Sequence, residues 1–136
     1  MVWQTVLVAI DVSQSTTDHQ LIQVLEGLNL KSNTQVILTH VIDGVKSDFN
    51  TVVEIPYLTV EKLLESYQEK LTYPSKIEIV TGDPAEEIIR LVNIYQVDLI
   101  IIGSRGLTGV KRILEGSVSS QVVSDAPCSV LVIKSK

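Results

Sequence analysis

Glycine and serine gather in one segment of this 136-residue chain, in a pattern suited to holding an anion. Four of the seven glycines lie between residues 103 and 116, in GSRGLTGVKRILEG, and Ser117, Ser119 and Ser120 follow directly. Glycine has no Cβ, so it lets backbone N–H groups approach a ligand closely. The N-terminus of a helix adds unpaired N–H donors and the positive end of a dipole, both suited to phosphate. The segment therefore predicts a phosphate site.

The local charge agrees with an anionic ligand. Residues 103–116 carry Arg105, Lys111 and Arg112 against a single acid, Glu115, in a chain whose formal net charge is −5. The alternative is that the glycines only permit a long surface loop and the cations are solvated. We favour the anion site because the glycines and serines stand at the end of an apolar strand. The segment lacks the spacing of both the P-loop and the dinucleotide G-x-G-x-x-G fingerprint.

Five short apolar stretches predict the strands that must position this segment. Near-continuous β-branched runs are typical of strands covered on both faces, as in a parallel sheet. The glycine-rich segment follows the fourth strand, and open α/β sheets bind ligands outside the carboxyl ends of their strands. The expected strands are Thr5–Asp11, Gln35–Ile42, Lys76–Thr81, Val97–Gly103 and Ser129–Lys134.

Between the strands the hydrophobic period becomes helical. The strongest helix start is Asp83-Pro84-Ala85-Glu86, which offers a capping Asp, a proline at the first helical position and a Glu three residues after the cap. The other helices are expected around Leu21–Leu28, around Val60–Leu71 after Pro56, and from Gly116-Ser117 to before Pro127. The alternation predicts one domain over residues 1–136, an α/β three-layer sandwich with a five-stranded, mostly parallel sheet. Residues 43–55 are expected to form a surface loop.

Composition excludes several classes of protein. The 16 acidic residues outnumber the 11 basic ones and no basic cluster occurs, which argues against nucleic-acid binding. No apolar run approaches the roughly 18 residues of a membrane span, and no secretory signal is visible at the N-terminus. The single cysteine excludes an intramolecular disulfide framework and fits a reducing compartment. We therefore expect a cytoplasmic protein.

The spacing Gly103-x2-Gly106-x9-Gly116-Ser117 matches the G-x2-G-x9-G-[S/T] signature of the universal stress protein family, in its ATP-binding branch. The chain also resembles that family in VAIDVS, in the GDPAEEI segment and in APCSVLVIK at the end. The resemblance implies a Rossmann-like fold of the adenine nucleotide alpha hydrolase type, with strand order 3-2-1-4-5 and a switch point between the first and fourth strands. It also implies a homodimer that pairs through the last strand, Ser129–Lys134.

The resemblance assigns the base and ribose to the first two strands. Ala9 and Asp11 are expected to flank the base and ribose, and the backbone of Val41 to hydrogen-bond the adenine edge. Asp11 could instead be an N-terminal cap of the first helix, and the sequence leaves both roles open.

The resemblance assigns the phosphates to the glycine-rich segment. Gly103 through Gly109 is expected to wrap the ribose and phosphates, and this stretch includes Ser104, Arg105 and Gly106. Gly116, Ser117, Val118 and Ser119 are expected to hold the terminal phosphates on the helix N-terminus. Mg or Mn could bridge the phosphates, although the sequence offers few hard oxygen ligands.

The remaining chemistry-bearing residues receive structural interpretations. His40 and Cys128 have no partners at metal-ligand spacing, so we interpret them as a structural histidine and a small buried hydrophobe. Three functions stay open: a nucleotide-binding switch or adaptor, a slow ATPase or phosphotransfer enzyme, and a ligand-free dimeric interaction module. We favour the first, because no general base is placed near the phosphates and turnover should be absent or slow.

Overall fold

The computed structural model describes residues 3–13, 15–43, 56–104 and 118–134. Strands and helices alternate along them, and residues 118–125 form a further helix before the last strand. The elements are β1 (Thr5–Ala9), α1 (Ser15–Gly27), β2 (Gln35–Asp43), α2 (Tyr57–Gln68), β3 (Ser75–Gly82), α3 (Pro84–Tyr95), β4 (Leu99–Ser104) and β5 (Ser129–Lys134). The expected surface loop after β2 lies outside the described residues, apart from Asp43.

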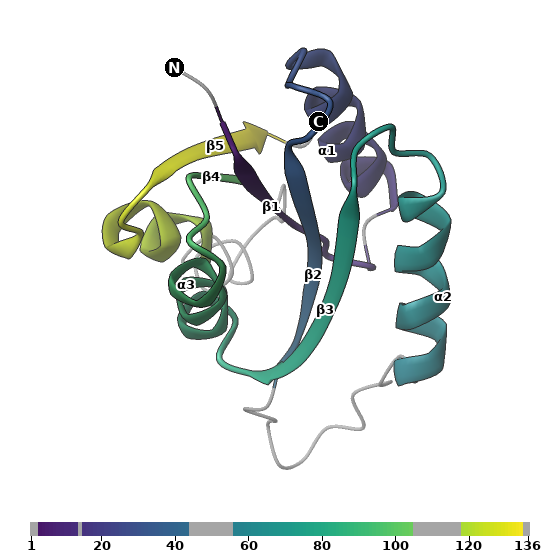
Figure 1. Cartoon of the computed structure of the whole chain (residues 1–136). Coiled ribbons are helices and arrows are strands. Elements are labelled where there is room, and N and C mark those ends of the chain that lie inside the picture. The colour runs from purple at the N-terminus through teal and green to yellow at the C-terminus, as the bar shows by residue number, and fades with distance from the viewer. Residues whose placement is uncertain (1–2, 14, 44–55, 105–117, 135–136) are drawn as a thin grey trace.

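The five strands form one parallel sheet in the order β3-β2-β1-β4-β5, which confirms the expected topology. β1 is the central strand: Leu7 pairs with Ile37 of β2 on one side and with Ile100 of β4 on the other. In Figure 1, α1 and α2 cover one face of the sheet, and α3 with helix 118–125 covers the other. The architecture is therefore the three-layer α/β sandwich that the sequence predicts.

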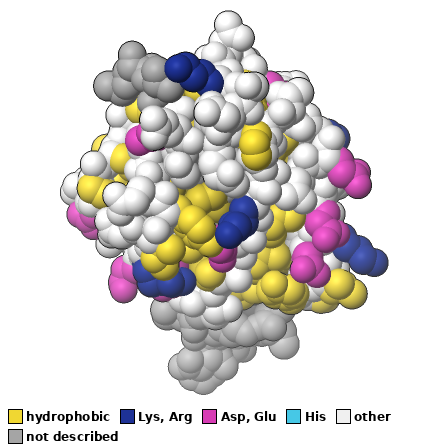
Figure 2. Space-filling view, viewed as in Figure 1, with side chains coloured by type: hydrophobic (Ala, Val, Ile, Leu, Met, Phe, Trp, Pro, Cys, Tyr) yellow, Lys and Arg dark blue, Asp and Glu magenta, His cyan; other side chains and the backbone are white. Residues whose placement is uncertain are grey.

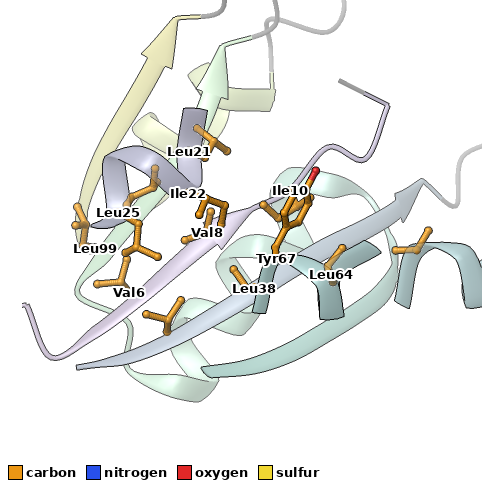
Figure 3. Close-up of a cluster of buried hydrophobic side chains, with 13 residues drawn as sticks. Val6, Val8, Ile10, Leu21, Ile22, Leu25, Leu38, Leu64, Tyr67 and Leu99 are labelled. Atoms are coloured by element: carbon orange, nitrogen blue, oxygen red, sulfur yellow. The ribbon is translucent and has the colours of Figure 1, made fainter. Parts of the chain in front are cut away.

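Two hydrophobic clusters fill the spaces between the layers, because successive side chains of a strand point to opposite faces. Val6 and Val8 of β1 pack on the α1 and α2 side, in the cluster shown in Figure 3. Leu7, between them in sequence, packs on the other side with Ile88 of α3 and Val122. None of the three β1 side chains is exposed to solvent, so the central strand anchors both cores.

The strand ends differ from those expected, and hydrogen bonds explain why. β1 ends at Ala9 rather than Asp11, because the N–H groups of Asp11 and Val12 donate to the Asp18 carboxylate instead of a neighbouring strand. β4 begins at Leu99 rather than Val97, because the Val97 N–H donates to Val92 O at the end of α3. β2 extends to Asp43, which pairs with Gly82 of β3.

The predicted start of α3 is confirmed in its details. Asp83 is the N-cap, and its Oδ2 accepts the Glu86 N–H at 3.1 Å. Pro84 follows at the first helical position, where its missing N–H leaves no donor unpaired. Ala85, Ile88 and Val92 then lie on the buried face. A local capping signal thus fixes where this helix begins.

Gly103, near the end of β4, allows α1 to pack closely against the sheet. A Cβ placed on Gly103 would lie 2.8 Å from Cγ2 of Thr17, which is nearer than real Cβ contacts come. We expect Gly103→Ala to lower the free energy of unfolding by about 1–3 kcal/mol, as overpacking does in well-packed cores. Urea denaturation measures the change.

The matched control is Gly27→Ala at the end of α1. A Cβ there meets nothing within 4 Å, and alanine favours helix over glycine by about 1 kcal/mol. This variant should be neutral or slightly stabilised. Equal stability of the Gly103→Ala variant and the natural protein would show that α1 moves aside without cost.

Candidate functional site

The carboxyl ends of β1, β2 and β4 meet at one edge of the sheet, because the three strands are adjacent and parallel. Ala9 pairs with Thr39 of β2 and with Ile102 of β4. Asp11 and Val41 lie two residues beyond this level, and Gly103 and Ser104 complete β4. The structure therefore places five of the predicted site residues at one edge: Ala9, Asp11, Val41, Gly103 and Ser104.

This edge has the form of a topological switch point. The chain leaves β1 for α1, which packs with the cluster that contains Val6 and Val8. Beyond β4, Val118 and Val122 of helix 118–125 pack with the cluster on the opposite face. The two connections thus diverge from adjacent strands, and open α/β sheets bind ligands in the crevice that such a divergence leaves.

Three of the predicted residues pack against the hydrophobic cluster on the α3 side of the sheet. Ala9, Val41 and Val118 are partly buried and pack against the cluster that contains Leu7 and Ile102. They come from β1, β2 and helix 118–125, so three segments far apart in sequence border the same cluster. An apolar wall with polar groups at its rim is the usual setting for a flat heteroaromatic ring.

The predicted phosphate-binding residues divide between the described and the remaining parts of the chain. Arg105, Gly106, Gly109, Gly116 and Ser117 lie outside the described residues. Ser104 ends β4 and Ser119 lies in helix 118–125, so these two serines flank that segment on the described side. Ser119 is largely buried, with 9% of its surface exposed.

The structure adds Asp18 of α1 to this edge, a residue that the sequence analysis did not assign to the site. Its Oδ1 accepts the Asp11 N–H and its Oδ2 accepts the Val12 N–H, both at 2.9 Å. The Asp18 side chain is fully buried, and burial raises its pKa from 3.8 to about 6 against the lowering effect of these two bonds. The available signal was its spacing: Asp18, Leu21 and Leu25 lie at i, i+3 and i+7, on the buried face of α1.

Asp11 and His40 also have defined roles around the end of β1. The Asp11 Oδ1 accepts the Ser13 hydroxyl at 2.9 Å. Nδ1 of His40 lies 2.8 Å from the Ile10 carbonyl oxygen and donates to it, while the Ile10 N–H donates to Thr39 O at 2.8 Å. His40 therefore holds β1 to β2, in agreement with its interpretation as a structural histidine.

Cys128 lies at the opposite edge of the sheet. It lines an open hollow of about 470 Å³ together with Trp3 and Asp98, where the amino ends of β1, β4 and β5 gather. Burial and the nearby Asp98 carboxylate raise the pKa of the Cys128 thiol. The thiol is therefore protonated near neutral pH and packs as a small hydrophobe.

Acidic and basic side chains are mixed on the face that Figure 2 shows. They are interspersed around hydrophobic ones.

Within the described ranges, no three His, Cys, Asp or Glu side chains gather as a metal site would require. No helix in the same ranges is long and apolar enough to cross a bilayer.

Comparison with known proteins identifies the family of this chain. The model of the universal stress protein family matches residues 3–134. Universal stress protein MJ0577 of Methanocaldococcus jannaschii is 34% identical over 126 residues, which cover 75% of this chain and 78% of the relative. MJ0531 of the same organism is 40% identical over 75 residues, but the match covers only 42% of its length.

Solved structures agree over the whole fold. The MJ0577 structure superposes with a TM-score of 0.70 at 31% identity and covers 100% of this chain and 99% of its own. A universal stress protein in complex with cAMP has the same TM-score at 21% identity, covering 98% of both chains, and the likeness concerns the fold alone. A family member from Arabidopsis thaliana with AMP bound has a TM-score of 0.66 at 24% identity, covering 98% and 92%.

The family match, the strand order and the switch point between β1 and β4 agree with one another. This chain belongs to the universal stress protein family.

Proposed function

We propose that this protein binds an adenine nucleotide, ATP in particular, at the carboxyl edge of β1, β2 and β4, and acts as a switch or adaptor in a stress response. The observation that carries the proposal is the placement of Ala9, Asp11, Val41, Gly103 and Ser104 at the carboxyl edge of three adjacent parallel strands, where the connections after β1 and β4 diverge. Solved relatives that hold AMP and cAMP support an adenine ligand. The glycine-rich sequence 103–116 supports a phosphorylated one.

In this proposal the two ends of the nucleotide meet different chemistry. The base and ribose lie against Ala9 and Val41 near Asp11. The phosphates lie toward Gly103–Gly109 and toward the start of helix 118–125, where Gly116, Ser117 and Ser119 supply donors. The residues present suit this division, because N–H groups and hydroxyls bind phosphate while small apolar side chains admit the ring. Mg or Mn, when bound, would neutralise phosphate charge.

Binding is tested by calorimetric titration of ATP and of adenosine, with Ser119→Ala compared with Ser120→Ala. Ser119 of helix 118–125 is largely buried, whereas the neighbouring Ser120 is exposed. We expect Ser119→Ala to weaken ATP binding about fivefold to tenfold, since it deletes a hydrogen bond to a charged group. Adenosine binding should be unchanged, and Ser120→Ala should leave both affinities as they are.

Experiments on the same purified protein distinguish the nucleotide-binding switch from the two alternative functions. A natural protein that binds neither ATP nor adenosine would favour a ligand-free interaction module. Sustained phosphate release from ATP would favour an ATPase or phosphotransfer enzyme over a passive switch. Mass spectrometry of whatever copurifies with the protein would identify the nucleotide.

We also propose that the protein is a cytoplasmic homodimer that pairs through β5. β5 lies at the edge of the sheet beside β4, and it carries the apolar sequence SVLVI. An apolar edge strand offers unpaired backbone groups to a second chain. Light scattering coupled to size exclusion measures the mass directly, and a monomer at micromolar concentration would contradict the proposed pairing.

A further inference from the structure

We propose that Asp18 is a positioning residue of the nucleotide site: by accepting both N–H groups of the Asp11–Val12 turn, it fixes the surface against which the adenosine half of the ligand lies. This inference rests on the proposed function. It concerns how the protein orients its ligand, and it assigns that task to a buried side chain on α1.

The two N–H groups of the Asp11–Val12 turn are both occupied by Asp18. In an open α/β sheet, the backbone N–H groups that follow a central strand are common donors to a bound anion. Here the N–H groups of Asp11 and Val12 donate to the two oxygens of Asp18, both at 2.9 Å. The turn after β1 therefore has neither of these donors to offer a phosphate, so its contribution is to the adenosine half of the site.

The turn after β1 has a strained backbone that hydrogen bonds hold on two sides. Val12 has φ of 60°, a conformation that costs a β-branched residue on the order of 1–3 kcal/mol. The two hydrogen bonds to Asp18 hold the turn on the α1 side. Ile10 is held on the β2 side, through its N–H to Thr39 O and its carbonyl to His40. With both flanks fixed, the turn presents one surface to a ligand.

The Asp18 carboxylate is buried among groups that solvate it poorly. Among the described residues, three titratable groups interact electrostatically with Asp18: Asp11 in the turn, His19 on α1 and Tyr67 on α2. Tyr67 and Ile10 belong to the same hydrophobic cluster, and both are labelled in Figure 3. The Tyr67 hydroxyl is buried without a hydrogen-bond partner in the described part of the chain. The ionised Asp18 carboxylate therefore lies in a poorly solvated environment, and the two backbone N–H groups that it accepts are what stabilise its charge.

A purely structural role would need only that the two N–H groups be satisfied. Asp18→Asn separates the two roles, because an amide fills the same volume but accepts only through its oxygen, so one N–H of the turn is left without its partner. Asp125→Asn is the matched control, since the same chemical change falls on an exposed residue of helix 118–125.

Calorimetric titrations of adenosine and of ATP test the proposal on folded protein, checked by circular dichroism. We expect Asp18→Asn to weaken both ligands by the same factor of about ten, the equivalent of one unsatisfied N–H group, and Asp125→Asn to weaken neither. Unchanged affinities with a changed melting temperature would overturn the inference and leave Asp18 a structural role. A loss for ATP alone would also overturn it, because Asp18 would then act at the phosphates.

A second measurement needs no variant. Adenosine has no phosphate to titrate, so its affinity for the natural protein reports on the site itself. As the pH falls through about 6, Asp18 gains a proton and loses an acceptor, and we expect adenosine to bind severalfold more weakly at about pH 5 than at about pH 7.5. A flat profile would overturn the inference. A natural protein that binds neither ligand would instead overturn the proposed function, and this inference with it.

Discussion

The free energy of unfolding is expected to fall by about 3 kcal/mol as the pH rises from about 4 to about 7, through Asp18 alone. Burial raises the pKa of the folded carboxyl from 3.8 to about 6. Between these two values the folded state binds more protons than the unfolded state, so stability from this group is present at low pH and is lost as the pH rises. About two pKa units at about 1.4 kcal/mol each give the magnitude.

Urea denaturation across that range, for the natural protein and for Asp18→Asn, isolates the effect. The difference between the two proteins should change with pH, whereas Asp125→Asn should follow the natural protein at every pH. Near neutral pH the asparagine variant should be about as stable as the natural protein. The variant no longer buries a charge, which stabilises it by about 3 kcal/mol. This offsets the cost of its one unsatisfied N–H group, about 1–3 kcal/mol. A difference independent of pH would mean that solvent reaches the carboxylate.

Gly116→Val should abolish ATP binding while the protein remains folded. Gly116 lies outside the described residues, and this expectation rests on its place in the Gly103-x2-Gly106-x9-Gly116-Ser117 spacing. A branched side chain at that position would occupy the space in which a phosphate must approach backbone N–H groups. We expect affinity for ATP to fall by about a hundredfold or more, the equivalent of losing about 3 kcal/mol of contacts to a charged group.

Calorimetric titration measures the loss, and circular dichroism with thermal melting verifies the fold. Gly27→Val provides the control, because it makes the same change where a Cβ meets nothing within 4 Å. If Gly116→Val binds ATP as tightly as the natural protein, the assignment of the phosphates to this segment is wrong. Retained adenosine binding in the variant would indicate that only the phosphate half was lost.

The sequence was sufficient to predict the elements whose causes are local. The β-branched runs of β1 and β4 predict buried strands because both faces of these strands are covered. Asp83 and Pro84 predict the start of α3 because the cap is formed within four residues. The order of elements then suffices for the class of fold, since parallel strands need crossover helices.

The features that escaped prediction depend on contacts across the sheet. Nothing local indicates that β1 stops at Ala9, since the cause is a carboxylate on α1. Asp18 is an acid in the first turn of α1, and only packing identifies it as a buried acceptor. The sequence suggested a ligand role for Gly103, and the contact with Thr17 gives it a packing role as well. The ligand roles of Ala9, Asp11 and Val41 stay predictions until a nucleotide is bound.

The close approach of Gly103 and Thr17 makes these two positions interdependent in any redesign of the protein. A methyl group added at 103 would meet the methyl group that threonine carries at 17, so the interface has room for one methyl at that point. Thr17→Ser supplies the missing space, and it should restore part of what Gly103→Ala loses. Such a compensating pair, 86 residues apart in the chain, would extend the range of tolerated sequences around the ligand site without moving α1.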